Sequence, residues 1–129
     1  MPRLNLTSKQ RRSSADAEHY VATALQRQGW RILARNFRHI GFELDLVALK
    51  SQTLIVVEVK ARRHRPDSER ELSQLLPRKK REALLRGATA MSSRLETTYN
   101  TIRIDLAIVY RGDQGRPCID YHVNALTHY

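Results

Sequence analysis

The chain has 129 residues, and 23 Lys and Arg against 13 Asp and Glu give it a formal net charge of +10. This length suits one domain with a buried core, and the charge favours a polyanionic partner, nucleic acid ahead of an anionic membrane surface. No apolar run approaches the ~20 residues of a membrane span, and the N-terminus lacks the apolar core of a secretory signal, so we expect no membrane partner and a cytoplasmic protein.

The N-terminal part predicts a basic arm followed by a helix. Residues 1–13 are basic and lack strong apolar periodicity, which is typical of a mobile arm. Ser13 or Ser14 is expected to cap a helix that runs to about Gln28. Glu18 lies in the first turn of that helix, where the helix dipole is by itself a sufficient reason for an acid.

Three strands are predicted next. Residues 30–40 mix apolar and basic side chains and read as a first strand, which Asn36 interrupts. Residues 42–49 alternate as a strand does, residues 51–52 fit a tight turn, and residues 53–61 resume the pattern. The last two segments therefore predict a hairpin.

Two acids and a lysine lie within this apolar hairpin, at Asp45, Glu58 and Lys60. Buried carboxylates are normally paired, protonated or bound to a metal. Side chains two apart on a strand share a face, so Glu43 projects with Asp45, and Glu58 projects with Lys60. If the register aligns these faces, the cluster suits a hard divalent cation, and the lysine could hold the nucleophile or offset charge on a phosphate. The alternative is a set of ordinary salt bridges on the solvated face of a sheet, with Lys60 paired to Glu58 or Glu43.

The remaining chain predicts a loop, a helix and one or two strands. Residues 62–77 carry two prolines and predict a long loop or lid, in which His64 is more simply a solvated basic group than a catalytic base. Pro77 suits the first position of the second helix, whose opening run, residues 78–81, is either a solvated face or a phosphate clamp.

Residues 101–110 predict a further strand, and residues 118–123 a short last one. Cys118 has no partner for an internal disulfide and reads as a small apolar residue. Asp105 is left outside the catalytic set, because its place on a central strand can be structural. A single domain at 14–129 is therefore expected, with two helices against a mixed sheet.

The ordered motifs resemble a known family. Asp45, twelve intervening residues and then Glu58-Val59-Lys60, after a helix bearing Glu18, resemble the PD-(D/E)xK nuclease core of archaeal Holliday-junction resolvases. More closely, the chain resembles the small bacterial YraN-like proteins, which are assigned to that superfamily. The match covers about residues 14–110, through AE at 17–18, GWRILARNFR, GFELDLVA, VVEVKARR, Lys80 and RIDLAIV. The sequence departs from the family where Ala17 and Phe42 replace the glycine that usually precedes each acid.

The resemblance implies an α/β, restriction-endonuclease-like core with a mixed sheet flanked by two helices, in the order α-β-β-β-α-β with a short last strand. It implies that Asp45 and Glu58 bind Mg²⁺ or Mn²⁺, with Glu18 completing the site. Lys60 would be the catalytic lysine, and Glu43 a further acid of the catalytic set. A homodimer is a reasonable expectation from the same resemblance.

Two functions from different classes follow. The first is a metal-dependent endonuclease that acts on DNA phosphodiesters, with branched or junction DNA as candidate substrates. Backbone contacts are expected from six basic residues: Arg35, Arg38, Arg62, Arg63, Lys79 and Lys80. The alternative is a non-catalytic nucleic-acid-binding adaptor that retains the nuclease fold, or a basic surface that faces ribosomal RNA or another acidic assembly.

Overall fold

The computed structural model describes residues 8–39, 42–94 and 98–123. In chain order its elements are α1 (Ser8–Arg27), β1 (Arg31–His39), β2 (Phe42–Lys50), β3 (Thr53–Ala61), α2 (Glu69–Leu75), α3 (Arg78–Ser92), β4 (Thr101–Arg111), a 3-10 turn (Asp113–Gly115) and β5 (Pro117–His122). This order confirms the predicted α/β class, with the last short strand present.

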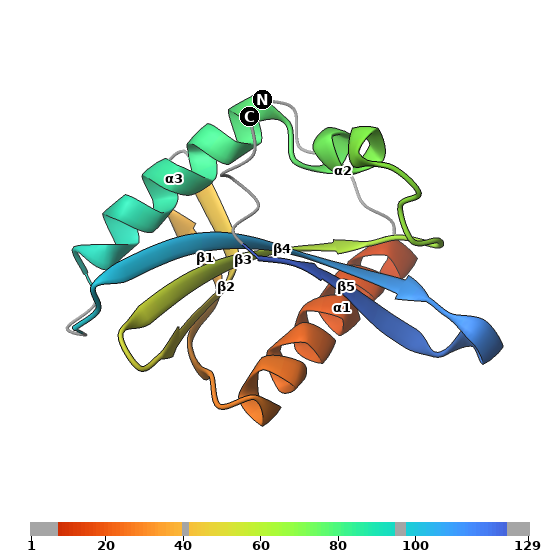
Figure 1. Cartoon of the computed structure of the whole chain (residues 1–129), viewed down its shortest axis with the longest axis horizontal. Helices are drawn as coiled ribbons and strands as arrows, with labels where there is room; N and C mark the ends of the chain where they lie inside the picture. The colour runs from red at the N-terminus through yellow and green to blue at the C-terminus, as the bar shows by residue number, and fades with distance from the viewer. Residues whose placement is uncertain (1–7, 40–41, 95–97, 124–129) are drawn as a thin grey trace.

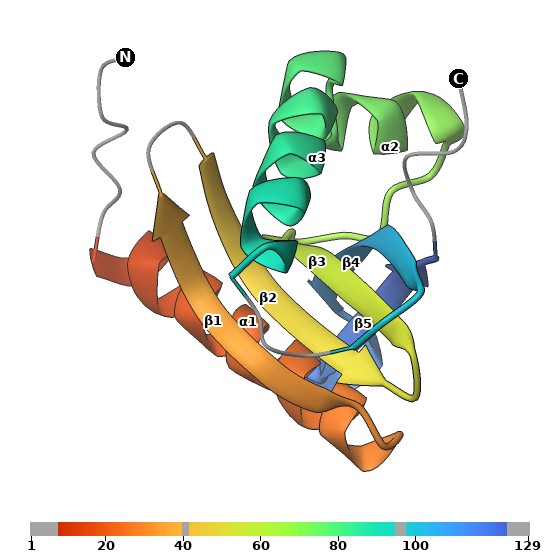
Figure 2. The ribbon, with the colours of Figure 1, turned by 90° about the vertical axis from the view of Figure 1, so that its left-hand side faces the viewer.

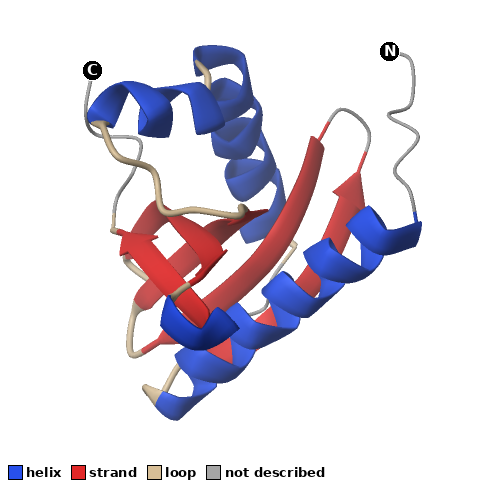
Figure 3. Ribbon diagram, turned by 90° about the vertical axis from the view of Figure 1, so that its right-hand side faces the viewer, coloured by secondary structure: helices blue, strands red, loops and turns tan. Residues whose placement is uncertain are grey.

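One five-stranded mixed sheet runs in the order β1-β2-β3-β4-β5. The pairs β1–β2, β2–β3 and β4–β5 are antiparallel, whereas β3–β4 is parallel. Parallel neighbours need a crossover connection, and α3 supplies it. α1 packs on the opposite side of the sheet from α3 (Figures 1 and 3).

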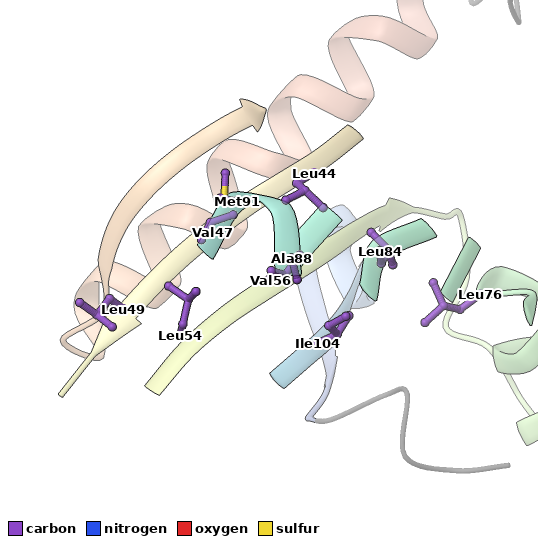
Figure 4. Close-up of a cluster of buried hydrophobic side chains, with 10 residues drawn as sticks. All are labelled: Leu44, Val47, Leu49, Leu54, Val56, Leu76, Leu84, Ala88, Met91 and Ile104. Carbon is purple, nitrogen blue, oxygen red and sulfur yellow. The ribbon is translucent and has the colours of Figure 1, made fainter. Parts of the chain in front are cut away.

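The alternation of β3 divides the core into two clusters. Leu54 and Val56 point to the α3 side, where they pack with Leu84, Ala88 and Met91 of that helix (Figure 4). The intervening residues point to the α1 side; they include Ile55 and Val57, which pack with Ala17, Val21, Ala22 and Leu25 of α1. Because β3 is covered on both faces, a charged residue on it is removed from water.

The helix predicted from Ser13 or Ser14 begins earlier, at Ser8, so the prediction that Glu18 lies in its first turn is wrong. Residues 9–12 are Lys, Gln, Arg and Arg, which have high helix propensity and extend the helix without needing an apolar face. The start of the predicted basic arm, residues 1–7, lies outside the described residues.

The loop predicted at 62–77 contains a helix, α2, so that prediction is wrong for its second half. Ser68 caps α2 by accepting a hydrogen bond from the Glu71 N–H over 3.3 Å, and Glu71 Oε2 accepts one from the Asp67 N–H over 2.8 Å. Ser and Glu three residues apart are the signature of a capping box, so the signal was present in the sequence. In the described part of the chain, no helix has the length and apolar character needed to cross a membrane.

Candidate active site

The site forms where β2 and β3 stop pairing with each other. Their backbones pair from Lys50 with Thr53 as far as Leu46 with Val57. At the next step Asp45 Oδ2 accepts a hydrogen bond from the Val59 N–H over 2.9 Å. The predicted hairpin is therefore correct, and its register brings Asp45 beside the segment that carries Glu58 and Lys60.

Glu58 is a buried charge held by two lysines. It is 3% exposed and lies on the central strand β3. Its Oε1 lies 3.4 Å from Lys60 Nζ and 3.4 Å from Lys80 Nζ, which comes from the first turn of α3. Glu58 Oε2 has no hydrogen-bond partner among the described residues. The predicted alternative of a Lys60–Glu58 ion pair is thus present, although the carboxylate is buried and does not lie on a solvated face.

Burial, with a smaller effect of neighbouring carboxylates, raises the pKa of two of the acids, Asp45 and Glu18. The pKa of Asp45 is raised to about 7, first by burial and then by the charge of Glu58, while the hydrogen bond from Val59 lowers it. Burial is also the first cause of the raised pKa of Glu18, which a hydrogen bond with Asn36 partly offsets. The charges of Glu43 and Glu58 add to that rise. Carboxylates that repel one another in this way are a common feature of functional sites.

An open cavity of about 590 Å³ is lined by three of these acids, Glu18, Glu43 and Asp45. Four elements line it: α1 through Ser14, Ala15 and Glu18, β1 through Asn36 and Arg38, β2 through Glu43 and Asp45, and α3 through Lys80. Figure 2 shows α1 and α3 on either side of the β1–β2 hairpin. The cavity thus joins residues that are far apart in sequence.

Asn36 forms part of this wall in a backbone conformation that is rare inside a strand. Its φ is +51°, in the left-handed region that asparagine tolerates better than most residues. The predicted interruption of the first strand at Asn36 is therefore seen as a local distortion, and its side chain is directed at Glu18. Its position opposite the acids had no signal in the sequence.

Two carboxylates of the site, those of Asp45 and Glu58, are suited to bind a divalent metal ion. Among the described residues, no three Asp, Glu, His or Cys side chains are grouped closely enough to hold a metal. Mg²⁺, however, is usually bound by one or two carboxylates and several waters. Asp45 and Glu58 could meet that requirement, and Glu58 Oε2, which has no hydrogen-bond partner within residues 8–39, 42–94 and 98–123, is available as a metal ligand. Glu18 lines the same cavity, and its carboxyl group interacts with that of Asp45.

The other predicted site residues lie in three different environments. Glu43 lines the cavity but is exposed, and its Oε1 lies 3.5 Å from Arg38 Nε. Arg35, Arg62, Arg63 and Lys79 are all exposed, as phosphate contacts should be. Lys80 differs from them, because it contacts Glu58.

Asp105 has a structural environment on the other face of the sheet. It is fully buried and accepts hydrogen bonds from Arg103 Nε over 3.1 Å and from the Tyr121 hydroxyl. Its neighbours along β4, Ala107 and Val109, pack on the α1 side. Keeping Asp105 outside the catalytic set agrees with this placement.

The sequence model of a protein family, described as "Uncharacterised protein family UPF0102", matches residues 17–109, well over half of the chain. The chain belongs to the UPF0102 family. This membership confirms the YraN-like resemblance, and the matched span includes Glu18, Asp45, Glu58 and Lys60.

Other UPF0102 proteins are similar over most of their length. The one from Nitratidesulfovibrio vulgaris (strain DP4) is 36% identical over 107 residues, 82% of this chain and 76% of that protein. The one from Pelobacter propionicus is 36% identical over 117 residues, 89% of this chain and 82% of that protein. A shorter match to a UPF0102 protein of Parasynechococcus marenigrum is 55% identical over 49 residues, 38% of this chain and 37% of that protein.

Proposed function

We propose that this UPF0102 protein is a metal-dependent endonuclease that hydrolyses DNA phosphodiesters. One observation carries the proposal: Asp45 and buried Glu58 lie together where β2 and β3 separate, and one oxygen of Glu58 has no partner in the part of the chain that the structure describes. A buried, unpaired carboxylate oxygen is costly, and a cation offsets that cost. Burial and then the charge of Glu58 raise the pKa of Asp45 to about 7, and a bound cation would favour its ionised form.

Each residue of the site has a chemical role in this proposal. Asp45 and Glu58 hold the divalent ion, which when bound supplies Lewis-acid activation of a water and of the phosphate. Lys60 lies on the same face of β3 as Glu58, where its ammonium group orients the attacking water or offsets the charge that develops on the phosphate. Arg38 on the cavity wall is placed to bind a phosphate of the DNA backbone.

A second candidate is the non-catalytic adaptor. Lys60 and Lys80 already compensate the charge of Glu58 without any metal. A protein that binds nucleic acid only would show salt-sensitive affinity, no divalent requirement and no response to the loss of Asp45.

The deciding experiment is a cleavage assay with Mg²⁺ or Mn²⁺ on labelled four-way junction, flap, single-stranded and duplex DNA. The parent is compared with Asp45→Asn and Lys60→Ala. Glu82→Gln is the matched acid-to-amide control, because Glu82 is an exposed acid of α3 that pairs with Arg78.

We expect the parent to cut at least one of these DNAs in a metal-dependent reaction. Both site variants should cut it about 10³-fold more slowly or worse, and the control should cut it as fast as the parent. Asp45→Asn cutting as fast as the parent would rule out the assigned site. Tight binding of every DNA by all variants, with no cutting, would instead establish the adaptor.

A further inference from the structure

We propose that Lys80 is a positioning residue that takes the place of the divalent cation beside Glu58 in the unloaded site and leaves that place when the metal binds. The inference rests on the proposed function. The opening turn of α3 thereby has a part in metal loading, where either a solvated face or a phosphate clamp was expected from the sequence.

The first step is the arrangement of charge around Glu58. Lys60 and Lys80 both approach the same oxygen, Oε1, at 3.4 Å. That distance exceeds the roughly 2.7–2.9 Å of a strong charge-assisted hydrogen bond, so both lysines act mainly as nearby charges. Two ammonium groups on one carboxylate oxygen also repel each other. At least one of the two lysines is therefore bound to Glu58 less tightly than a lysine in an isolated ion pair.

The second step identifies the lysine that can leave. Lys60 is on β3, whose backbone pairs with β4 at this point, Lys60 with Ile108. Its side chain starts two residues from Glu58 on the same face, so the ammonium group stays near that carboxylate. Lys80 comes from a different element, its side chain is 37% exposed against 27% for Lys60, and it lines the cavity.

The third step is the effect of a metal. A divalent ion held by Asp45 and Glu58 would add two positive charges beside two lysines. Repulsion between the metal and the ammonium groups favours movement of the lysine that has free space beside it. That lysine is Lys80, which can rotate away from Glu58 into the cavity that it lines. There its ammonium group is placed to meet a phosphate of the incoming DNA. Metal binding and phosphate binding would thus share one side chain.

The test measures Mn²⁺ affinity without DNA, by the loss of the free-ion electron paramagnetic resonance signal on titration. Lys80→Met removes the charge but keeps the unbranched stem, and Lys80→Gln is a second form in case one variant folds poorly. We expect both to bind Mn²⁺ about tenfold more tightly than the parent, because removal of one charge about 6 Å from a divalent ion gives roughly that factor even in a water-like dielectric. Lys80→Arg should restore affinity close to that of the parent.

Two further variants separate the possible failures. Arg86→Met removes one exposed positive charge from the same helix and should leave Mn²⁺ affinity unchanged. Asp45→Asn should abolish the binding. If Asp45→Asn abolishes it but Lys80→Met and Lys80→Gln bind no more tightly than the parent, the role of Lys80 is wrong and the metal site stands. If Asp45→Asn changes nothing, or no variant binds Mn²⁺, both the proposed function and this inference are overturned.

Discussion

The carboxylate of Asp45 on β2 accepts a hydrogen bond from the backbone N–H of Val59 on β3, over 2.9 Å. The bond fixes the Asp45 side chain beside Val59, which separates Glu58 from Lys60 along β3, just where β2 and β3 stop pairing. A backbone donor of this kind holds the acid in place whether or not a metal is bound.

The raised pKa of Asp45 predicts a specific dependence of stability on pH in the metal-free protein. An unfolded Asp ionises near pH 4, whereas folded Asp45 keeps its proton to about pH 7, so its ionisation opposes folding between these values. The stability that the neutral acid retains at low pH is thus lost as the pH rises from 4 to 7.

Asp45→Asn should remove this loss. The measurement is denaturant unfolding in the presence of a chelator. The free energy of unfolding of Asp45→Asn minus that of the parent should rise between pH 4 and pH 7 by up to about 4 kcal/mol. Glu82→Gln should show no such trend. A constant difference for Asp45→Asn across the range would mean that Asp45 titrates normally.

Glu18 and Glu43 should contribute unequally to the proposed cleavage. Glu18 is half-buried and faces Asn36, where it can hold a metal-bound water, so Glu18→Gln should slow single-turnover cleavage about 10- to 100-fold. Glu43 is exposed beside Arg38, so Glu43→Gln should cost less than about threefold. Equal losses would show that both acids serve the metal.

Gly87 determines how closely α3 approaches β2. A Cβ at this position would lie 2.8 Å from Phe42 Cδ2 and 3.0 Å from Leu44 Cδ2. Gly87→Ala should therefore destabilise the protein by about 1–3 kcal/mol in denaturant unfolding, although alanine favours a helix. Arg86→Ala, on the exposed side, should stay within about 0.5 kcal/mol of the parent. Increased stability of Gly87→Ala would mean that the two elements separate at little cost.

Tyr121 should matter for stability and not for the site. Tyr121→Phe removes a hydrogen bond to fully buried Asp105 and should cost about 1–3 kcal/mol in thermal or denaturant unfolding. Tyr20→Phe is the matched control, since Tyr20 donates at the surface to the Pro117 carbonyl and should cost under about 1 kcal/mol. Because Tyr121 packs on the α1 face, its loss should leave Mn²⁺ affinity unchanged; a change would connect the two faces of the sheet.

Arg38 should act as a phosphate contact without sequence preference. Arg38→Gln is expected to weaken binding of all DNAs alike and to reduce the slope of log affinity against log salt by about one, measured by fluorescence anisotropy. Arg31→Gln, on the same strand but away from the cavity, should change the slope less. An unchanged slope for Arg38→Gln would exclude that arginine from the DNA path.

Local patterns in the sequence determined most of the fold. Period-two alternation located β2, β3 and β4, and a two-residue turn set the β2–β3 register, because a hairpin joined by a short turn has little freedom to slip. The same register placed Asp45 beside Glu58, so the centre of the candidate site was predictable. The errors were at boundaries: α1 starts at Ser8 because the Lys, Gln and Arg residues before Ser13 favour a helix without an apolar pattern, and α2 was hidden by flanking prolines although its cap is readable.

Only the tertiary structure decided what surrounds that centre. The partners of Glu58 and Asp45 include Lys80 from α3 and Glu18 from α1, which reach the site because the two helices cover opposite faces of the sheet. No local pattern encodes that meeting, since it depends on how the crossover carries α3 over β2 and how closely Gly87 lets it pack. Backbone periodicity is a property of neighbouring residues, whereas the charge balance of a buried carboxylate depends on the side chains that the complete fold brings within a few ångströms.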